Sequence, residues 1–371
     1  MSNRPRVLYL TYEFNNSDGW ARCTVNWING LRKDVSDADI LTLRNVPNEK
    51  APWDIKAFLL SATNGRFKKI LLMVDYLNCI IRLRKDYDII HCLIEPLAPL
   101  AHKLAKKYRA RLMIQFVGTY CVQPVNTRWK ELYYRAYKYS SCNISISNFT
   151  RKRAIEEFPD IQVNVAHIGV DEDEFKIGIN NLRKNYFLFV GASKPRKGLL
   201  TALEGFYEFC KLYKNFKFRI VGFFDEKNSY NRKVLAFISQ NNLPVEFIGS
   251  VEHEELQIQF SQCTAHVLPS VTEKFNFEGF GLVHLEANMC GSLTIGTRDS
   301  ANEEIISHDL SGYLVDQGNA LQVCEAMRKC VAKNFDSDSE SKTAEDCRNW
   351  AKQFSWQLSI DTIVKNYLIS D

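Results

Sequence analysis

The sequence predicts an α/β protein with two doubly wound domains, and three observations support this fold class. The chain has 371 residues, more than one ordinary hydrophobic core organises. Short apolar runs alternate with segments of helical periodicity, and the alternation begins a second time near residue 186. Apolar residues make up 46% and charged residues 25% of the chain, which is typical of a soluble globular protein.

The strand-like runs fall into two sets, and each run is almost continuously apolar, as parallel strands covered on both faces are. The first set is RVLYLTY (6–12), DIIHCLI (88–94), RLMIQFVG (111–118) and CNISIS (142–147). The second set is YFLFVGAS (186–193), FKFRIVG (216–222), VEFIGSV (245–251), AHVLPS (265–270) and LTIGT (293–297). A helix-like segment follows each run of the second set, so each set predicts one doubly wound sheet.

A polar stretch, FKIGINNLRKN (175–185), separates the two sets. We therefore expect a first domain over 1–178 and a second over 179–355. Ligands of open α/β sheets lie beyond the carboxyl ends of the strands, so two such domains facing each other are expected to enclose a ligand-binding cleft. The turns from strand to helix are the places to look for chemistry.

Three features limit the function classes. The eleven cysteines are scattered without a C-x-x-C pair, which favours reduced thiols in the cytoplasm. No apolar stretch reaches the roughly 18 residues of a membrane-spanning helix, and the apolar run at the start is too short for a signal peptide. No G-x-G-x-x-G follows the first strand, which argues against a dinucleotide-dependent dehydrogenase.

Positive charge is concentrated in the first domain. Residues 1–153 hold 26 Lys and Arg against 12 Asp and Glu, with basic and aromatic residues clustered around 103–111 and 128–138. Solvated helix faces, an anionic membrane or acceptor surface, and nucleic acid would each explain this pattern. No nucleic-acid-binding motif accompanies the charge, so we expect no nucleic-acid partner.

The stretch FEGFGLVHLEANMCG (277–291) places two acids, Glu278 and Glu286, around a Gly-Phe-Gly turn. The backbone N–H groups at a helix start favour an anion such as a diphosphate. Helical rise over eight residues predicts about 12 Å between the acids, which suits one grip on a sugar and another on a ribose. Ordinary helix capping explains such acids equally well when the stretch is taken alone.

Two further turns point to the same anion. GASKPRKGL (191–199) follows the first strand of the second domain, and an ammonium at Lys197 would neutralise a diphosphate. EFNNSDGWARC (13–23) follows the first strand of the chain, where Gly19 would let backbone N–H groups approach phosphates. Three turns suited to one anion favour a binding site over capping.

These stretches, with HIGVDEDEF (167–175) and FSW (354–356), resemble the signatures of the retaining family 4 glycosyltransferases, in order over nearly the whole chain. The resemblance implies the GT-B fold, a central cleft, and a C-terminal helix in 356–371 that returns to the first domain. It also implies metal-independent transfer of a sugar from a nucleotide-sugar, with retention at the anomeric carbon. The first domain would bind a glycan or lipid-linked acceptor. Peripheral contact with an anionic membrane is a further expectation, which rests on the basic clusters of that domain.

The resemblance also implies site residues. Glu278 and Lys197 would serve catalysis, Glu278 holding the donor sugar and Lys197 the diphosphate, while Glu286 would hold the ribose. The full donor-binding set is Gly19, Arg196, Lys197, Glu278, Gly279, Phe280, Gly281, Leu282 and Glu286. No metal and no cofactor is expected.

Two positions depart from the family pattern. Ala192 stands where an arginine is usual, and Val117 where a histidine usually precedes Gly-Thr. We expect Arg196 to replace the missing arginine. The same departures support an alternative, a non-catalytic GT-B subunit that acts as a binding or scaffold module.

Three other polar residues have two interpretations each. His284 is either a packed helix residue or a catalyst, and Glu95 either caps the helix after its strand or contacts the acceptor. Glu304 either shapes the donor pocket or caps a helix.

Overall fold

The computed structural model describes residues 4–14, 19–43, 53–59, 67–83, 86–175, 183–334 and 340–368. These residues form two compact units, one of residues 1–168 with 356–371 and the other of residues 169–355. The division falls between Ile168 and Gly169, whereas the expected boundary at 178/179 lies outside the described residues.

The first unit contains a parallel sheet with the strand order β3-β2-β1-β4-β5-β6-β7. Leu10 of β1 pairs with Leu41 of β2 on one side and Cys92 of β4 on the other, so the chain winds outward from β1 in both directions. The strands are β1 Arg6–Leu10, β2 Asp37–Thr42, β3 Asp54–Phe58, β4 Ile89–Cys92, β5 Arg111–Phe116, β6 Cys142–Ser145 and β7 Val163–Val165.

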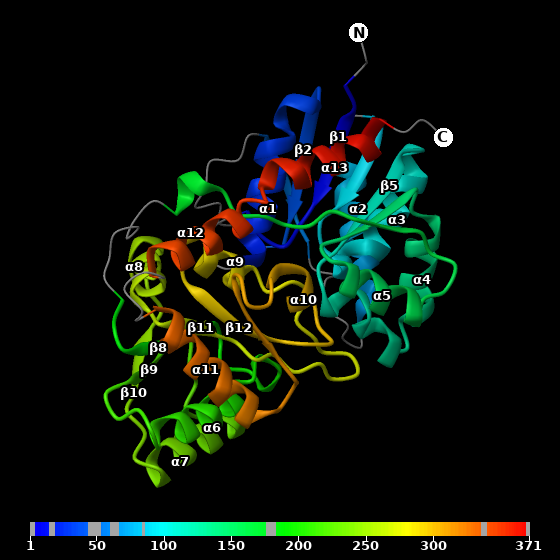
Figure 1. Cartoon of the computed structure of the whole chain (residues 1–371). Helices are drawn as coiled ribbons and strands as arrows, with labels where there is room; N and C mark the ends of the chain where they lie inside the picture. Colours follow the sequence, from blue (N-terminus) through cyan, green and yellow to red (C-terminus); the bar gives the residue numbers. More distant parts are fainter. Residues whose placement is uncertain are drawn as a thin grey trace. The chain divides into compact units, whose positions relative to one another are not determined.

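Helices connect these parallel strands (Figure 1). They are α1 Gly19–Leu31, α2 Lys68–Arg82, α3 Ala98–Tyr108, α4 Lys130–Tyr139 and α5 Asn148–Glu157, with 3₁₀ turns η1 Arg32–Asp34, η2 Glu95–Leu97, η3 Thr119–Cys121 and η4 Gln123–Asn126. Ser147 caps α5 by accepting a hydrogen bond from the backbone N–H of Thr150, which satisfies one donor of the helix start.

The last helix, α13 (Trp356–Leu368), belongs to this first unit and packs against α1 (Figure 1). The indole N–H of Trp27 donates to the hydroxyl of Ser359 at 3.1 Å. Gly30 makes the close approach possible, because a Cβ there would lie 1.9 Å from Cδ1 of Ile360. Arg111 also donates to the backbone carbonyl groups of Asn366 and Tyr367, which fastens the end of α13 to β5.

The second unit repeats the pattern with the strand order β10-β9-β8-β11-β12-β13, all parallel. Its strands are β8 Tyr186–Val190, β9 Lys217–Val221, β10 Val245–Gly249, β11 Ala265–Val267, β12 Leu293–Thr297 and β13 Gly312–Val315. Its helices are α6 Leu199–Cys210, α7 Ser229–Gln240, α8 His253–Gln262, α9 Leu282–Met289, α10 Asn302–Ile305, α11 Ala320–Asn334 and α12 Glu340–Ala351, with 3₁₀ turns η5 Glu172–Glu174 and η6 Pro195–Lys197.

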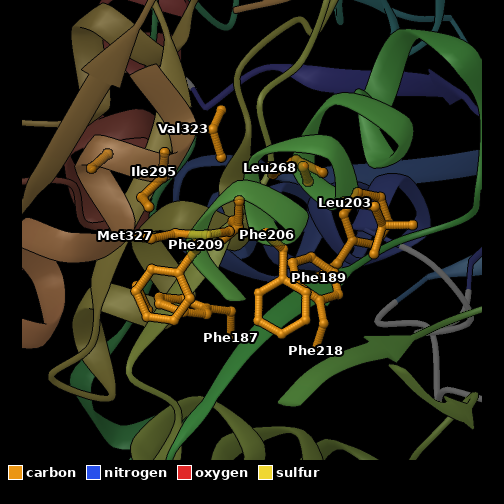
Figure 2. Packing of buried hydrophobic residues seen from close by; sticks show 14 of the residues in the cluster. Phe187, Phe189, Leu203, Phe206, Phe209, Phe218, Leu268, Ile295, Val323 and Met327 are labelled. Atoms are coloured by element: carbon orange, nitrogen blue, oxygen red, sulfur yellow. The ribbon is translucent and has the colours of Figure 1, made fainter. Parts of the chain in front are cut away.

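A phenylalanine-rich core holds α6 and α11 on this sheet (Figure 2). Phe187 of β8 lies edge-on to Phe209 of α6, with ring centroids 5.1 Å apart, and Phe206 packs on Phe218 of β9. Because these large side chains are fully buried, the sheet and its helices form a rigid base for the turns at the strand ends.

The predicted fold class of two doubly wound α/β domains is confirmed, and all nine predicted runs contain a strand. Sequence reasoning missed four strands: β2, β3, β7 and β13. β7 has three residues and β13 begins with glycine, while β2 begins with Asp37, so none of these resembles a long apolar run.

Candidate active site

The candidate site of the second unit lies where its strand order reverses. β8 and β11 are neighbours in the sheet although β9 and β10 lie between them in the sequence, so the turn after β8 meets the loop after β11 at the carboxyl edge. The backbone N–H of Val271 donates to the carbonyl of Arg196 at 2.8 Å. The sheet topology therefore brings the residues around 196 and the residues that follow 270 together.

Gly198 fixes the turn after β8 against the end of β11. Its φ of +69° lies in the left-handed region, and an added Cβ would lie 1.9 Å from the carbonyl oxygen of Pro269. Any larger residue would push the turn away from β11. Gly198 therefore helps to hold its cationic neighbours, Arg196 and Lys197, in place beside the end of β11.

The carboxylate of Glu278 forms ion pairs with two cations of that turn. Its Oε2 lies 2.6 Å from Nζ of Lys197 and 2.8 Å from Nη1 of Arg196. The side chains of Glu278 and Lys197 are 12% and 15% exposed, and that of Arg196 is 27% exposed. One carboxylate against two cations leaves a net positive charge, which suits an anionic ligand.

Electrostatics keep the carboxylate of Glu278 ionised. Burial alone would raise the pKa of Glu278, but Lys197 and Arg196 outweigh it and hold that pKa at about 2. Burial lowers the pKa of Lys197, while Glu278 opposes this shift by stabilising the ammonium. An ionised carboxylate has only hydrogen-bond acceptors, so it can accept hydrogen bonds from the hydroxyl groups of a ligand.

The other positions of the turn differ from these two. Lys194 is exposed, and Ser193 is buried with its hydroxyl donating to Oδ1 of Asn231 at 2.6 Å. Ala192 offers no charge. The turn therefore directs Arg196 and Lys197, and not Lys194, to the glutamate.

The loop that holds Glu278 ends at the start of α9. Phe280 is buried, and Gly281 has φ +91°, with an added Cβ 2.8 Å from Nδ2 of Asn302. The helix begins only at Leu282, so residues 278–281 do not follow helical rise. The 12 Å estimate between Glu278 and Glu286 was therefore wrong in its premise, because it assumed helix over all eight residues.

Glu286 and His284 lie on α9 as buried residues. Glu286 is 5% exposed. His284 is fully buried beside His266 of β11, with ring centroids 4.9 Å apart, and burial lowers the pKa of His284 to about 3. A neutral ring inside the packing favours the interpretation of His284 as a packed helix residue. Glu304 lies on α10, half-buried.

Two of the predicted residues lie in the first unit. Gly19 is the first residue of α1, and an added Cβ there would meet nothing within 4 Å. Glu95 does not cap a helix: its Oε1 accepts the backbone N–H of Val117 at 2.6 Å and thereby links the ends of β4 and β5. The capping interpretation of Glu95 is corrected by this contact.

Sequence reasoning missed two supports of the site. Asn302 accepts the backbone N–H of Thr297 through Oδ1 and packs beside Gly281, and Gln317 accepts the N–H of Thr272. Both are single amides after strand ends, and only their neighbours in space reveal their roles. Among the described residues, no group of three or more His, Cys, Asp or Glu side chains converges to hold a metal ion.

The fold and this cation-carboxylate cluster define a class of protein, the two-domain proteins of the GT-B fold. Sucrose-phosphate synthase from Thermosynechococcus elongatus superposes with a TM-score of 0.77 at 17% identity, over 98% of each chain. HepE from Anabaena, solved with UDP and glucose, superposes with a TM-score of 0.75 at 16% identity, over 97% of this chain and 98% of that chain. These likenesses establish the fold.

Sequence comparison points to a family. Residues 170–354, just under half of the chain, are similar to the family model of the group 1 glycosyl transferases. An uncharacterised glycosyltransferase of Methanocaldococcus jannaschii is 25% identical over 237 residues, which are 62% of this chain and 61% of that protein. The chain thus spans about three fifths of the length of that relative. Arg196, Lys197, Glu278 and Glu286 all lie inside the family match.

Proposed function

We propose that this chain is a retaining, metal-independent glycosyltransferase that moves a hexose from a nucleotide-sugar to a glycan, glycolipid or other acceptor. The observation that supports it most is the cluster of Arg196 and Lys197 around Glu278, because it offers cations for a diphosphate beside a carboxylate for sugar hydroxyls. The match of residues 170–354 to the group 1 glycosyl transferases supports the same conclusion.

In the proposed reaction, an acceptor hydroxyl attacks the anomeric carbon on the face from which the diphosphate departs. The bond between the anomeric carbon and the phosphate oxygen breaks, the new glycosidic bond forms, and the departing phosphate takes the hydroxyl proton. Lys197 and Arg196 offset the negative charge that develops on the leaving group. Glu278 holds the donor sugar, Glu286 the ribose, and the N–H groups from Gly279 to Leu282 the phosphates between them.

A uridine nucleotide-sugar is the first donor to test. HepE, which shares the fold, was solved in complexes with UDP and with UDP-glucose. We expect the protein to act in the cytoplasm, peripherally at an anionic membrane, since the first unit is basic and no described helix is long and apolar enough to span a bilayer.

Thermal unfolding with a panel of nucleotide-sugars tests donor binding. A true donor at 100 times its dissociation constant stabilises the folded state by about 2.7 kcal/mol, and the free nucleotide diphosphate also stabilises it. An Arg196→Ala, Lys197→Ala double variant supplies the control, because it removes both cations that contact Glu278. The proposal is contradicted if no nucleotide-sugar stabilises the protein. It is also contradicted if the nucleotide-sugars stabilise the double variant as much as the unchanged protein.

Retention and metal independence need the active enzyme. Proton NMR of the first product formed from an α-linked donor should show an α-glycoside, and a β-glycoside would contradict retention. The rate should be unchanged by a chelator, whereas loss of activity that Mg²⁺ or Mn²⁺ restores would contradict metal independence.

The second candidate is a non-catalytic GT-B subunit, favoured by Ala192 and Val117 at positions where the resembled family has Arg and His. Both candidates bind nucleotide diphosphate. An assay for slow hydrolysis or transfer of a bound nucleotide-sugar distinguishes the two candidates, because the enzyme performs this reaction and the scaffold does not.

A further inference from the structure

The helix α2 of the first unit buries charged side chains and exposes apolar ones. Its buried residues are Lys68, Leu72, Asp75 and Cys79, and its outward face is mostly apolar. The apolar side chains on that face and their exposed fractions are Phe67 64%, Ile70 61%, Met73 53%, Val74 46%, Leu77 49% and Ile81 74%. A surface helix normally turns its apolar face to the core, so this arrangement indicates a partner.

Polar contacts fix α2 in this orientation. Lys68 is 1% exposed, and its Nζ donates to the hydroxyl of Tyr133 on α4 at 2.9 Å. Burial lowers the pKa of Lys68 to about 8. Rotating the apolar face inward would break this contact of a buried ammonium, which opposes the rotation.

Exposed cations lie on α2 and on the neighbouring helices of the first unit. α2 contacts α3 and α3 contacts α4, and the link is seen in Lys103 of α3 over the ring of Tyr76 and Lys106 over the ring of Tyr139. Across residues 67–82, 98–109 and 128–139, ten exposed side chains are basic and one, Glu131, is acidic. The basic ones are Lys69, Arg82, Lys103, Lys106, Lys107, Arg109, Arg128, Lys130, Arg135 and Lys138.

A shallow pocket of 280 Å³ lies at the start of α2, lined by Phe67, Lys69, Ile70, Arg128 and Trp129. The ring of Trp129 lies 4.6 Å from the guanidinium of Arg128 and 5.8 Å from Nζ of Lys69. Two cations beside aromatic and aliphatic groups suit a phosphate that is attached to an apolar chain.

We propose that the outward face of α2, with the cations of α3 and α4, is a docking surface for an anionic phospholipid bilayer. The inference rests on the membrane part of the proposed function and deepens it by assigning the surface. α2 has 15 residues, fewer than the roughly 20 that span a bilayer, so it would lie in the interface plane with its apolar side chains among the acyl chains.

Charge decides between this occupant and a second copy of the chain. Two copies that met through this face would bring like charges together, which opposes association, while anionic headgroups offset each cation near the surface. A bilayer also accepts the full length of a helix face without a matching groove.

Co-sedimentation of the full chain with vesicles tests the proposal. Binding to phosphatidylcholine vesicles that contain phosphatidylglycerol should be strong at low salt and weaken at high salt, and pure phosphatidylcholine should bind at least tenfold less. The Ile70→Ser, Leu77→Ser variant should lower the partition coefficient by about tenfold or more, because it removes two exposed apolar groups from the face.

The control variant is Leu212→Ser, Leu321→Ser in the second unit, where the two leucines are 67% and 69% exposed. It should bind vesicles within about twofold of the unchanged protein. A Lys69→Gln, Arg128→Gln variant should weaken binding to anionic vesicles by at least tenfold while retaining the weak binding to neutral ones.

Equal vesicle binding by the two serine variants would overturn the proposal. A lipid-free dimer in sedimentation velocity that the Ile70→Ser, Leu77→Ser variant abolishes would also overturn it, in favour of a second copy. All variants should keep the unfolding temperature and the stabilisation by nucleotide-sugar. Loss of vesicle binding alone therefore bears on the docking surface, and failure of nucleotide-sugar stabilisation alone bears on the proposed function.

Discussion

Arg196 and Glu278 form an ion pair of 2.8 Å although 82 residues separate them in sequence. The two lie in the segments that follow β8 and β11, strands that are adjacent only because the sheet reverses its strand order there. Lys197 joins them at 2.6 Å from the same carboxylate oxygen. The contact between Arg196 and Glu278 supports the proposal that Arg196 stands in for the arginine that position 192 lacks.

The exchange of Arg196 for Ala should lower turnover by about 10²-fold, comparable with the loss of one oxyanion donor, because Lys197 alone then faces the charge on the leaving group. The measurement is kcat with the donor found in the stabilisation panel. Lys194→Ala is the matched control from the same turn, since Lys194 is exposed, and it should change kcat little. An Arg196→Ala enzyme with an unchanged rate would contradict the replacement and favour the scaffold alternative.

Glu286→Ala should weaken binding of the nucleotide diphosphate and of the donor alike, because both contain the ribose. Glu278→Ala should leave nucleotide diphosphate binding almost unchanged and damage sugar turnover. Each lost charged hydrogen bond costs roughly 1.5 to 3 kcal/mol. Titration calorimetry with nucleotide diphosphate separates the two variants, and an equal loss of affinity in both would show that the division of labour is wrong.

Gly198→Ala should destabilise the second unit and reduce activity together. The left-handed φ of +69° and the 1.9 Å approach to the carbonyl of Pro269 both oppose a Cβ, and left-handed backbone alone costs about 1 to 2 kcal/mol. Gly19→Ala is the control for stability, since a Cβ there meets nothing within 4 Å. Thermal unfolding of both variants is the measurement, and an equal unfolding temperature for the two would disprove the packing argument.

Glu95 should make the stability of the protein depend on pH. Burial raises the pKa of Glu95 to about 8, although the N–H of Val117 lowers it in part. Its pKa in the unfolded chain is near 4.5, so the folded state holds a proton that the unfolded state has released at neutral pH. The free energy of unfolding should therefore be highest below the unfolded pKa and fall as the pH rises through about 8.

Glu95→Gln should flatten this dependence, because an amide cannot lose the proton and can still accept the N–H of Val117. The measurement is denaturant unfolding at a series of pH values from about 5 to about 8, a range that lies between the pKa values of Glu95 in the unfolded and folded chain. Glu303→Gln is the control at an exposed glutamate and should keep the slope of the unchanged protein. If both variants keep that slope, another group causes it.

Much of the candidate site could be predicted from local sequence. Gly198 and Gly281 mark turns that need a left-handed backbone, and the apolar run of β8 places Lys197 just beyond a strand end. The mutual contact of Arg196, Lys197 and Glu278 could not be predicted, because it depends on which strands are neighbours. The separation of Glu278 from Glu286 was also beyond the sequence, since helix periodicity does not show that α9 begins only at Leu282.

By itself, the sequence determined the two-domain α/β architecture, because buried parallel strands leave apolar runs that recur at regular intervals. It also determined the basic character of the first unit, since charge is a property of composition. The tertiary structure decided which turns meet, because long-range pairing of β8 with β11 is a property of the sheet. It alone showed that α2 exposes its apolar face, because the burial of Lys68 against Tyr133, and not the helical pattern, sets which side of that helix faces water.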